Sequence, residues 1–362
     1  MIGYCQYKFV LKKNIALVQS TKLTLKEVAK QLGVSTATVS NAFNRPDQLS
    51  SSLRERILKE SAQLGYHGPN LAARSLRKGE SGVVGVMLAD SLSYSLSDPM
   101  ANKLLQGVAE VLVENKKQLL LLSSDVESTE QSSAQSLPDG FIFYGAPKGN
   151  SFERILASGK PVIAVDFEQK QVGSVNIDNY QAAYDAMQDV LSPSANALVA
   201  VLGMRIIPSD RVCRLVETDL EGDSKEISRL RLKGYLESAR QLNVTIPAEQ
   251  IWHIPVNTPQ MAEKAAREAL NSVPRPDVIF CMSDVIALAT VRVARELTLH
   301  VPDDLQIVGF DDIPEAQRSQ PGITTVCQQS LEKGRLAARM LLENSQDNVV
   351  LETRLIRRQS TR

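Results

Sequence analysis

Hydrophobic and polar positions follow two different patterns along the chain. Between Leu23 and Leu64, apolar residues recur three or four positions apart, the spacing of helices with one buried face. From Val83 on, they form short, nearly continuous runs separated by helical stretches. The runs are "GVVGVML", "QLLLLSS", "GFIFYG", "KPVIAVDF", "ALVAVLG", "DVIFCMS" and "LQIVGFD". The pattern predicts an all-α head followed by an α/β body of parallel strands and crossover helices.

The head begins with two predicted helices joined by a tight turn. "TLKE", from Thr24 to Glu27, is a capping box that marks a helix start. Gly33 ends that helix, and Ser35 can cap a second one. Their apolar positions are Leu25, Val28, Ala29 and Leu32, then Val39, Ala42 and Phe43.

A third helix closes the predicted head. "NRPDQLSS" reads as a loop broken by Pro46, and "SLRE", from Ser52 to Glu55, is a second capping box. The apolar positions of this helix are Ile57, Leu58, Ala62 and Leu64, and Gly65 ends it. Two helices around a glycine turn, followed by a third that completes the core, form a helix-turn-helix arrangement.

The second helix is built from slim residues. Its segment "STATVS" uses types that form helices less readily than Leu, Glu or Lys. Thr36, Ala37 and Asn41 share its exposed face, while Val39 and Phe43 point into the core. Without long side chains, that face fits a DNA major groove about 12 Å wide, where Asn41 can bind adenine, the Ala37 methyl suits thymine and Thr36 serves either role. The alternative is an ordinary exposed helix.

A short segment links head and body. Pro69 breaks the chain, and Asn70 to Leu76 make one or two helical turns. A helix that short is marginal in water. We therefore expect it to order only against a partner, either a second copy of itself or DNA.

The charge distribution is uneven, although the net charge is zero. Residues 1–78 hold 13 Lys and Arg against four Asp and Glu, while the remaining residues hold 28 against 37. A basic head on an acidic body favours a polyanionic partner such as a nucleic acid, although a basic face is usually just solvated.

Several protein classes are disfavoured. The chain has no apolar run long enough to span a membrane, and its N-terminus is not a convincing signal peptide, so we expect a cytoplasmic protein. The four cysteines lack metal-type spacing, and no P-loop, GxSxG or HExxH motif is present, so we expect no enzyme, metal or cofactor. The three histidines (His67, His253 and His300) lie outside the expected ligand cleft.

Several motifs together resemble the LacI/GalR family of bacterial transcription regulators, from Leu23 to the C-terminus. They are "TLKEVAKQLGVSTATVSNAFNRP", "GYHGPNLAARSL", "RLRLKGY", "PDVIFCMSDVIALATVRVARE", "VPDDLQIVGFDDIPEA", "PGITTVCQQSLEKGRLAARMLL" and "LETRLIRRQST". The resemblance implies a helix-turn-helix head, a hinge helix and a two-lobed, periplasmic-binding-protein-like core that forms a homodimer. The segment after "LLLLSS" is shorter than in the family, which leaves a helix before Asp139 open.

The resemblance also implies domain boundaries. Residues 1–22 form an N-terminal extension, 23–68 the helix-turn-helix domain and 69–79 the hinge helix and linker. Lobe one comprises 80–178 and 327–352, and lobe two comprises 179–326 and 353–362.

DNA-contacting residues carry over from the family by position. Phosphate contacts fall to Thr24, Ser35, Thr38, Ser40 and Asn44. Leu53 replaces a polar residue usual there, so one phosphate contact is expected to be missing. In the hinge, Asn70, Ala73 and Leu76 fit the minor-groove pattern, in which two Leu76 side chains of a dimer wedge a base step open.

Effector-binding candidates follow the strands of the body, because such proteins bind ligands at the carboxyl ends of parallel strands. They are Asp98, Asp166, Arg231, Asn257, Ser283, Asp284, Asp311 and Gln328. Arg231 and Asp311 are the strongest, as a guanidinium and a carboxylate that face each other across a cleft. Asp284 and Asp312 have an alternative role as helix caps. The single Trp252 favours core packing in a strand.

The sequence thus predicts a transcription regulator, a repressor by family habit, whose dimer binds a near-palindromic operator. A small-molecule effector, sugar-like or nucleobase-like, switches it by preferring one lobe closure. The alternative is a solute-binding protein of the periplasmic type without DNA function.

Overall fold

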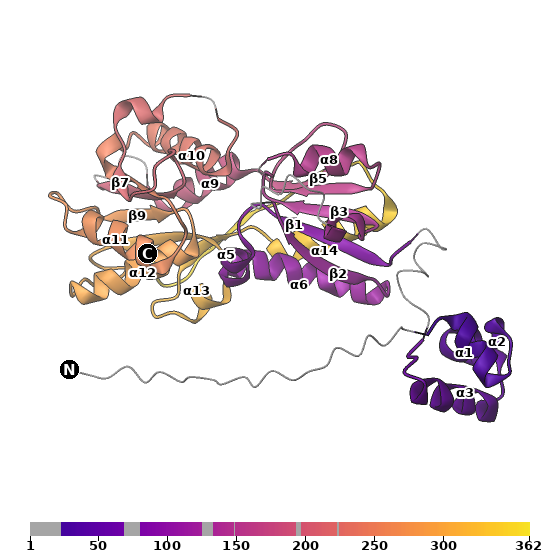
Figure 1. Ribbon diagram of the computed structural model, residues 1–362. Helices are drawn as coiled ribbons and strands as arrows, with labels where there is room; N and C mark the ends of the chain where they lie inside the picture. Colours follow the sequence, from indigo (N-terminus) through magenta and orange to yellow (C-terminus); the bar gives the residue numbers. More distant parts are fainter. Residues whose placement is uncertain (1–22, 69–79, 125–132, 148, 193–196, 223) are drawn as a thin grey trace, which may run out of the picture. The chain divides into compact units, whose positions relative to one another are not determined.

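A computed structural model describes residues 23–68, 80–124, 133–147, 149–192, 197–222 and 224–362 (Figure 1). The chain divides into two units, a head within residues 1–81 and a body from Gly82 to Arg362. The predictions for 1–22 and 69–79, including Asn70, Ala73 and Leu76, lie outside the described residues.

The head consists of three α-helices and one 3-10 turn. They are α1 (Leu25–Leu32), α2 (Thr36–Asn44), η1 (Pro46–Gln48) and α3 (Ser51–Gln63). The predicted capping box of α1 is confirmed: Thr24 Oγ1 accepts from the Glu27 amide at 3.3 Å, and the Glu27 carboxylate accepts from the Thr24 amide at 2.7 Å. Gly33 ends α1 at a φ of 65°, a left-handed conformation that suits glycine.

A small apolar core holds the three helices together. Its buried side chains are Val28, Ala29, Val39, Ala42, Ile57 and Tyr66. Phe43 packs edge-on against Tyr66, with ring centroids 5.7 Å apart. The stability of α2 therefore comes from tertiary packing rather than from its helix propensity.

The predicted capping box from Ser52 to Glu55 is wrong. α3 begins one residue earlier, at Ser51, and its N-cap Ser50 makes no side-chain capping bond. Leu49 packs against the core, so the chain turns into the helix directly after it. Ala62 and Leu64 are exposed because the helix buries Ile57 and Ser61 instead.

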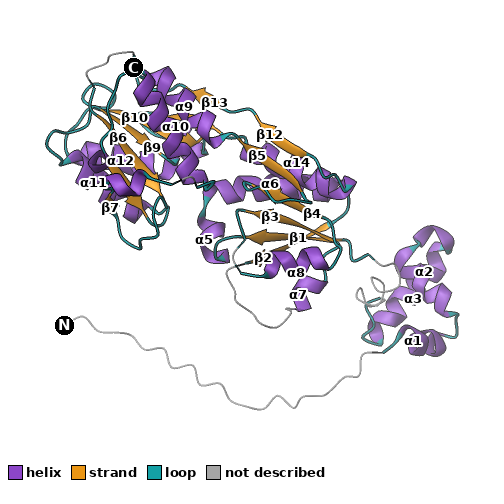
Figure 2. Ribbon diagram, turned by 90° about the horizontal axis from the view of Figure 1, so that it is seen from above, coloured by secondary structure: helices purple, strands orange, loops and turns teal. Residues whose placement is uncertain are grey.

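Six parallel strands form the first sheet of the body, in the order β12-β5-β4-β3-β1-β2 (Figure 2). Their bounds are Val83–Leu88 (β1), Gln118–Ser123 (β2), Gly140–Tyr144 (β3), Val162–Val165 (β4), Gly173–Ile177 (β5) and Asn348–Leu351 (β12). On β1, Val86 and Met87 belong to apolar clusters on opposite faces, which explains the uninterrupted apolar run. We call this sheet and its helices lobe one.

The helices of lobe one connect or cover these strands. They are α5 (Leu92–Ser97), α6 (Pro99–Glu114), α7 (Ser133–Ser136), α8 (Ser151–Ala157) and α14 (Ser330–Glu343). The sequence left it undecided whether a helix precedes Asp139. Among the described residues of that segment, the structure has the single helical turn α7. α6 and α14 pack very closely, because a Cβ at Gly334 would lie 2.1 Å from the Leu104 carbonyl oxygen.

Seven strands form the second sheet, in the order β13-β11-β10-β9-β6-β8-β7. The end strands β13 and β7 are antiparallel to their neighbours, and the other pairs are parallel. The bounds are Val199–Met204 (β6), Cys213–Arg214 (β7), Ile251–Ile254 (β8), Val278–Cys281 (β9), Gln306–Asp311 (β10), Thr324–Cys327 (β11) and Arg354–Ile356 (β13). Trp252 lies fully buried on β8, which confirms its core role. We call this sheet and its helices lobe two.

The helices of lobe two surround its sheet (Figure 1). They are α9 (Asn179–Val190), η2 (Glu217–Leu220), α10 (Ile227–Gln241), η3 (Ala248–Gln250), α11 (Pro259–Leu270), α12 (Asp284–Glu296) and α13 (Pro314–Arg318). The chain passes between the sheets three times, from β5 to β6, from β11 to β12 and from β12 to β13. All seven predicted strand runs are strands, and the α/β class with a helical head is confirmed.

Candidate DNA-binding helix and candidate effector site

The outer surface of α2 carries the predicted base-reading residues. Ser35 caps the helix, since its Oγ accepts from the Thr38 amide at 3.0 Å. Thr36 and Ala37 are exposed, and Asn41 is half-buried. The Asn41 amide donates to Gln48 Oε1 at 3.2 Å, a contact that the sequence reasoning did not foresee.

The predicted phosphate-contacting side chains mostly bond back to the head. Thr24 Oγ1 donates to the Glu27 carboxylate at 2.8 Å, and Asn44 Nδ2 donates to the Ser40 carbonyl at 2.9 Å. Leu53 packs against the core of the head, so this position offers no polar group to a phosphate. Seven of the 13 cations counted in residues 1–78 fall in 1–22 and 69–79, outside the described residues.

Seven charged side chains and one amide gather near the strand ends of both sheets, two of them contributed by the helices α10 and α14. We call Asp90, Asp98, Asp166, Arg205, Arg231, Asp311, Gln328 and Lys333 the strand-end cluster. Asp166, Arg205 and Asp311 have φ angles of 63°, 51° and 126°, at or directly after the ends of β4, β6 and β10. Such angles cost about 1–3 kcal/mol each in residues other than glycine and concentrate at functional sites.

A polar relay joins the two lobes within this cluster. Lys333 on α14 is fully buried, and its Nζ donates to Asp166 Oδ1 at 2.5 Å and to Gln328 Oε1 at 2.9 Å. Gln328 Nε2 donates in turn to Asp311 Oδ1 at 2.6 Å. The relay therefore runs from β4 in lobe one to β10 in lobe two.

Arg231 anchors the lobe-two end of the relay. Its Nε donates to Asn179 Oδ1 at 2.9 Å, its Nη1 donates to the Met282 carbonyl at 2.7 Å, and its guanidinium lies 3.5 Å from the centre of the Phe310 ring. Asp311 Oδ1 lies 3.9 Å from Nη1. The prediction that Arg231 and Asp311 face each other across a cleft is wrong, because α10 and β10 both belong to lobe two.

A second cross-lobe contact joins the ends of β1 and β6. Arg205 Nη1 donates to both carboxylate oxygens of Asp90, at 3.2 and 3.0 Å, and its guanidinium lies 5.5 Å from the centre of the Tyr94 ring. Behind Arg205, the Nδ1 of His253 accepts from the Ile206 amide at 3.1 Å. Buried His253 thus holds the backbone that carries Arg205.

Asp98 lies at the start of α6. Its Oδ1 accepts from the Met100 amide at 3.2 Å, so it caps the helix. Burial raises the pKa of Asp98, and burial likewise raises the pKa of Asp311 well above its ordinary range. The charge of Asp98 adds to the rise at Asp311, so the two carboxylates lie within electrostatic reach of each other.

Comparisons with known proteins agree with this architecture. Residues 24–70 match the family model "Bacterial regulatory proteins, lacI family", and residues 212–361 match the model "Periplasmic binding protein-like domain". The HTH-type transcriptional regulator Rv3575c of Mycobacterium tuberculosis is 34% identical over 348 residues, covering 93% of this chain and 96% of the relative. This chain belongs to the LacI family.

Other LacI-family proteins are similar over the same length. The HTH-type transcriptional repressor CytR of Escherichia coli is 29% identical over 95% of this chain and 98% of that protein. A crystal structure of a LacI-family transcriptional regulator from Corynebacterium glutamicum superposes with a TM-score of 0.65 at 26% identity, over 93% of this chain and 98% of the other. The chain is therefore a DNA-binding transcription regulator, and its named relatives are regulators rather than enzymes.

Two further candidates of this LacI-family core, Ser283 and Asp284, lie at the start of α12, and a third, Asn257 before α11, contacts Ser283. Ser283 Oγ donates to Asn257 Oδ1 at 2.7 Å and accepts from the Ile286 amide at 3.2 Å, so Ser283 caps α12. The predicted alternative that Asp284 caps this helix is wrong. Its two carboxylate oxygens instead accept from Thr325 Oγ1 at 2.6 Å and from the Ile313 amide at 2.9 Å.

Asp284 and Asp312 are structural residues. Asp284 is fully buried with both oxygens bonded, so it offers nothing to an effector, and its inclusion among the effector-binding candidates is wrong. Asp312 caps no helix, since Ile313 is the N-cap of α13, and its carboxylate pairs with Arg358 at 2.6 Å.

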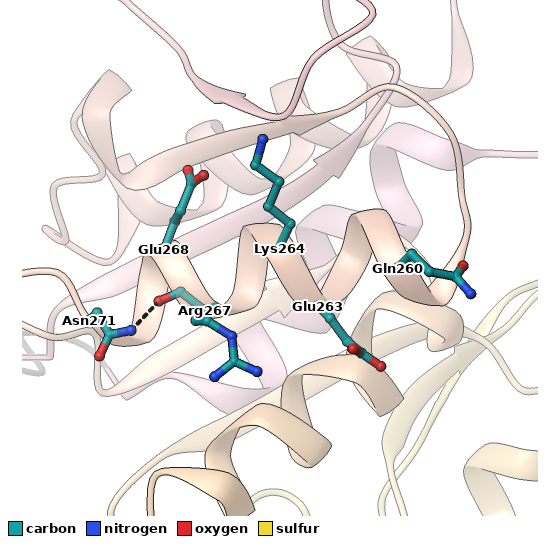
Figure 3. Close-up of a pocket in the computed structure, with 6 residues that line it drawn as sticks. All are labelled: Gln260, Glu263, Lys264, Arg267, Glu268 and Asn271. Carbon is teal, nitrogen blue, oxygen red and sulfur yellow. Dashed lines mark hydrogen bonds between the residues drawn. The ribbon is translucent and has the colours of Figure 1, made fainter. Parts of the chain in front are cut away.

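Two surface hollows lie apart from the strand-end cluster. One runs along α11, lined by Gln260, Glu263, Lys264, Arg267, Glu268 and Asn271 (Figure 3). Because its lining residues stand on a single helix, it is an open surface rather than an enclosed site. The other lies against α9 and β13 and includes Asp185, Asp189 and Arg354. No described helix is long and apolar enough to cross a membrane.

The sequence reasoning missed Asp90, Arg205 and Lys333 in this cluster. The first two follow the ends of β1 and β6, so the rule that selected Asp166 would also have found them. Lys333 shares a helix face with buried Ala337 and Leu341, and a charged residue in an apolar stripe is itself a signal.

Proposed function

We propose that this chain is an effector-switched repressor that acts in the cytoplasm as a homodimer on a near-palindromic operator. One observation carries the DNA half of the proposal. The slim face of α2 is presented outward, with Thr36 and Ala37 exposed, on a helix that is held from behind by Val39 and Ala42. A solute-binding protein without DNA function has no use for such a head.

Base reading falls to Thr36, Ala37 and Asn41. The Ala37 methyl suits a thymine methyl, Asn41 can bind adenine bidentately, and Thr36 can bond to either kind of base edge. Asn41 Nδ2 has two N–H donors, so Asn41 can keep its bond to Gln48 while its second N–H and its Oδ1 bond to adenine. The operator half-site is therefore expected to be read mainly at A·T pairs.

Backbone contacts position α2 on the duplex. We assign them to Thr24, Ser35, Thr38, Ser40 and Asn44, whose hydroxyls and amides can bond to phosphates without reading sequence. In the hinge, we assign minor-groove contacts to Asn70 and Ala73, and a wedge between base pairs to Leu76.

The effector half of the proposal rests on the strand-end cluster. Its candidate ligand contacts, together with the bonded pair Asn257 and Ser283, are Asp98, Asp166, Arg231, Asn257, Ser283, Asp311 and Gln328. They come from both lobes, divided as 80–178 with 327–352 and 179–326 with 353–362. A sugar-like or nucleobase-like ligand that binds one lobe arrangement better shifts the population toward it.

Selection from random DNA duplexes with the purified full chain tests the proposal. We expect enrichment of an inverted repeat, rich in A·T pairs at the read positions, bound with an affinity that falls steeply with salt. A control pool selected by a chain with Thr36→Glu and Asn41→Glu should lose the enrichment. The repressor proposal fails if the unsubstituted chain selects no common sequence with or without small molecules present.

A further inference from the structure

Two cations of the strand-end cluster are already neutralised by the chain. Arg205 is held by both oxygens of Asp90, and Lys333 by Asp166 at 2.5 Å. Hydrogen bonds between ionised partners are shorter and stronger than those between neutral groups. A buried lysine in such a site suggests an anchor for an anionic ligand, but Lys333 has its own carboxylate and the Gln328 amide oxygen.

The third cation of the cluster, Arg231, already uses some of its N–H groups within the chain. Arg231 gives its Nε to Asn179 and its Nη1 to the Met282 carbonyl, and it stacks on Phe310. Asp311 lies 3.9 Å away, at the outer limit of an ion pair. No cation of the cluster is therefore left without a partner of its own.

The carboxylates of the cluster are less well satisfied. Asp98 bonds to backbone amides and, among the described residues, has no cation within ion-pair distance. Asp166 and Asp311 each use only Oδ1 in the hydrogen bonds of the described chain, although both side chains are at least nine-tenths buried. The site thus holds a surplus of acceptors.

The pKa values of two tyrosines are raised by the same carboxylates. Burial raises the pKa of Tyr94, and the charge of Asp98 raises it further. The pKa of Tyr144 at the end of β3 is raised by burial, and then by Asp166, Asp98 and Asp311 together. Asp166 and Asp311 are already the partners of Lys333 and Arg231, so Asp98 is the carboxylate that this cluster holds in excess. An added anion at this place would meet that charge and no cation of the cluster that is not already paired.

We propose that the effector presents hydrogen-bond donors and no negative charge to this site, with Asp98 of lobe one and Asp311 of lobe two as its acceptors. The inference rests on the proposed effector function and narrows its ligand class. Neutral polyols, nucleosides and amine-bearing sugars fit, whereas sugar phosphates and sugar acids do not. Asp98 becomes the residue that determines this specificity, because it has no cation of its own.

The first test measures the charge surplus without any ligand. Asp98→Asn keeps the helix cap, since Asn and Asp cap equally well, and removes the unpaired charge. We expect the melting temperature of the full chain to rise by about 2–4 °C, which corresponds to a gain of about 1 kcal/mol in the free energy of unfolding for a domain of this size. The matched control is Asp178→Asn at the exposed N-cap of α9, which should leave the melting temperature unchanged. An unchanged or lower melting temperature for Asp98→Asn overturns the proposal.

The second test measures ligand class by thermal shift with matched probes. Glucose, ribose, cellobiose, myo-inositol and adenosine are compared with glucosamine, and with glucose 6-phosphate, ribose 5-phosphate, gluconate and AMP. We expect at least one uncharged or amine-bearing probe to raise the melting temperature, its anionic counterpart to raise it less than a tenth as much, and Asp98→Asn to reduce the shift of the active probe. A larger shift from any anionic probe, or no shift from all the uncharged and amine-bearing ones, overturns the proposal. Because neither assay contains DNA, a failure here is distinct from a failure of operator binding.

Discussion

At the residue scale, Asp284 shows how a carboxylate can hold a loop in place instead of binding a ligand. It is fully buried at the first position of α12 and bonds to Thr325 on β11 and to the Ile313 amide before α13. Burial raises its pKa to about 7 from an ordinary value of 3.8, and the neighbouring charge of Asp312 adds to the rise. Between the ordinary value of 3.8 and about 7, the folded chain therefore keeps a proton on Asp284 that the unfolded chain releases.

This proton links stability to pH with a definite sign. Because the folded pKa lies above the unfolded one, the stabilising contribution is complete below the unfolded value and is lost as the pH rises through about 7. Asp284→Asn removes the titrating group. Between about pH 5 and about pH 8, we therefore expect the melting temperature of the variant to change less than that of the unsubstituted chain. If the melting temperatures of the two proteins changed equally with pH, the assignment of the titration to Asp284 would be contradicted.

Asn41 is the residue on which base preference depends most directly. Its amide is already oriented by the 3.2 Å bond to Gln48. We expect Asn41→Ala to relax the preference at one position of each half-site, at about 1–3 kcal/mol, because a bidentate contact to adenine is lost. Competition gel shifts with single-base operator variants measure this. The control Gln63→Ala, exposed near the end of α3, should keep the preference, and retained discrimination in Asn41→Ala would exclude the adenine contact.

At the element scale, the contact between α6 and α14 defines lobe one. The two helices come from opposite ends of the body's sequence and meet where neither has a side chain at the crossing point. A Cβ at Gly107 would lie 2.0 Å from the Leu331 carbonyl oxygen, and one at Gly334 would lie 2.1 Å from the Leu104 carbonyl oxygen. Both obstacles are backbone atoms, which cannot rotate away.

Gly334→Ala should therefore destabilise the body despite the better helix propensity of alanine. Forcing the helices apart costs about 1–3 kcal/mol, as in other overpacked cores, which exceeds the gain of about 1 kcal/mol from propensity. Denaturant unfolding of the full chain measures the difference. Glu343→Ala at the exposed end of the same helix serves as control, and a more stable Gly334→Ala chain would refute the close packing.

At the scale of the whole molecule, a few polar contacts tie the lobes of the body together besides the three chain crossings. Arg205 pairs with Asp90, Gln328 bonds to Asp311, and Lys103 Nζ donates to the Asp312 carbonyl oxygen at 2.6 Å. These bonds stabilise the lobe arrangement without an effector. Any ligand that acts on the lobes does so by changing the balance of these contacts.

The Arg205–Asp90 pair gives a direct test of this balance. Arg205→Gln removes the charge that links the ends of β1 and β6, and we expect faster amide hydrogen exchange at the two strand ends in the ligand-free chain. The double variant Asp90→Arg with Arg205→Asp reverses the pair and should restore slow amide hydrogen exchange. Arg211→Gln, an exposed neighbour, is the control. Slow exchange in Arg205→Gln would show that the pair does not hold the lobes.

Much of this protein was determined by its sequence alone. The strand runs, the "TLKE" cap, the Gly33 turn and the inward face of α2 depend on residues within a few positions of one another, and these features were predicted correctly. Strand ends also located Asp166 and Asp311, because the carboxyl end of a parallel strand is a place that local pattern can identify. The failures at local scale were small, as at Ser52, where a core contact of Leu49 set the helix start.

Only the tertiary structure decided how the polar residues pair. Lys333 with Asp166, Arg205 with Asp90, and Asp284 with Thr325 join residues far apart in the chain, and each pair depends on which strands become neighbours. Sequence reasoning set Arg231 and Asp311 opposite each other across a cleft, although its own bounds put both in lobe two. In the structure their charged atoms lie 3.9 Å apart within that lobe. The hydrophobic pattern determines the helices and strands, because the face that each segment buries follows from the order of apolar residues within that segment. The role of a charge depends on the charges around it, and those are set when the sheets assemble.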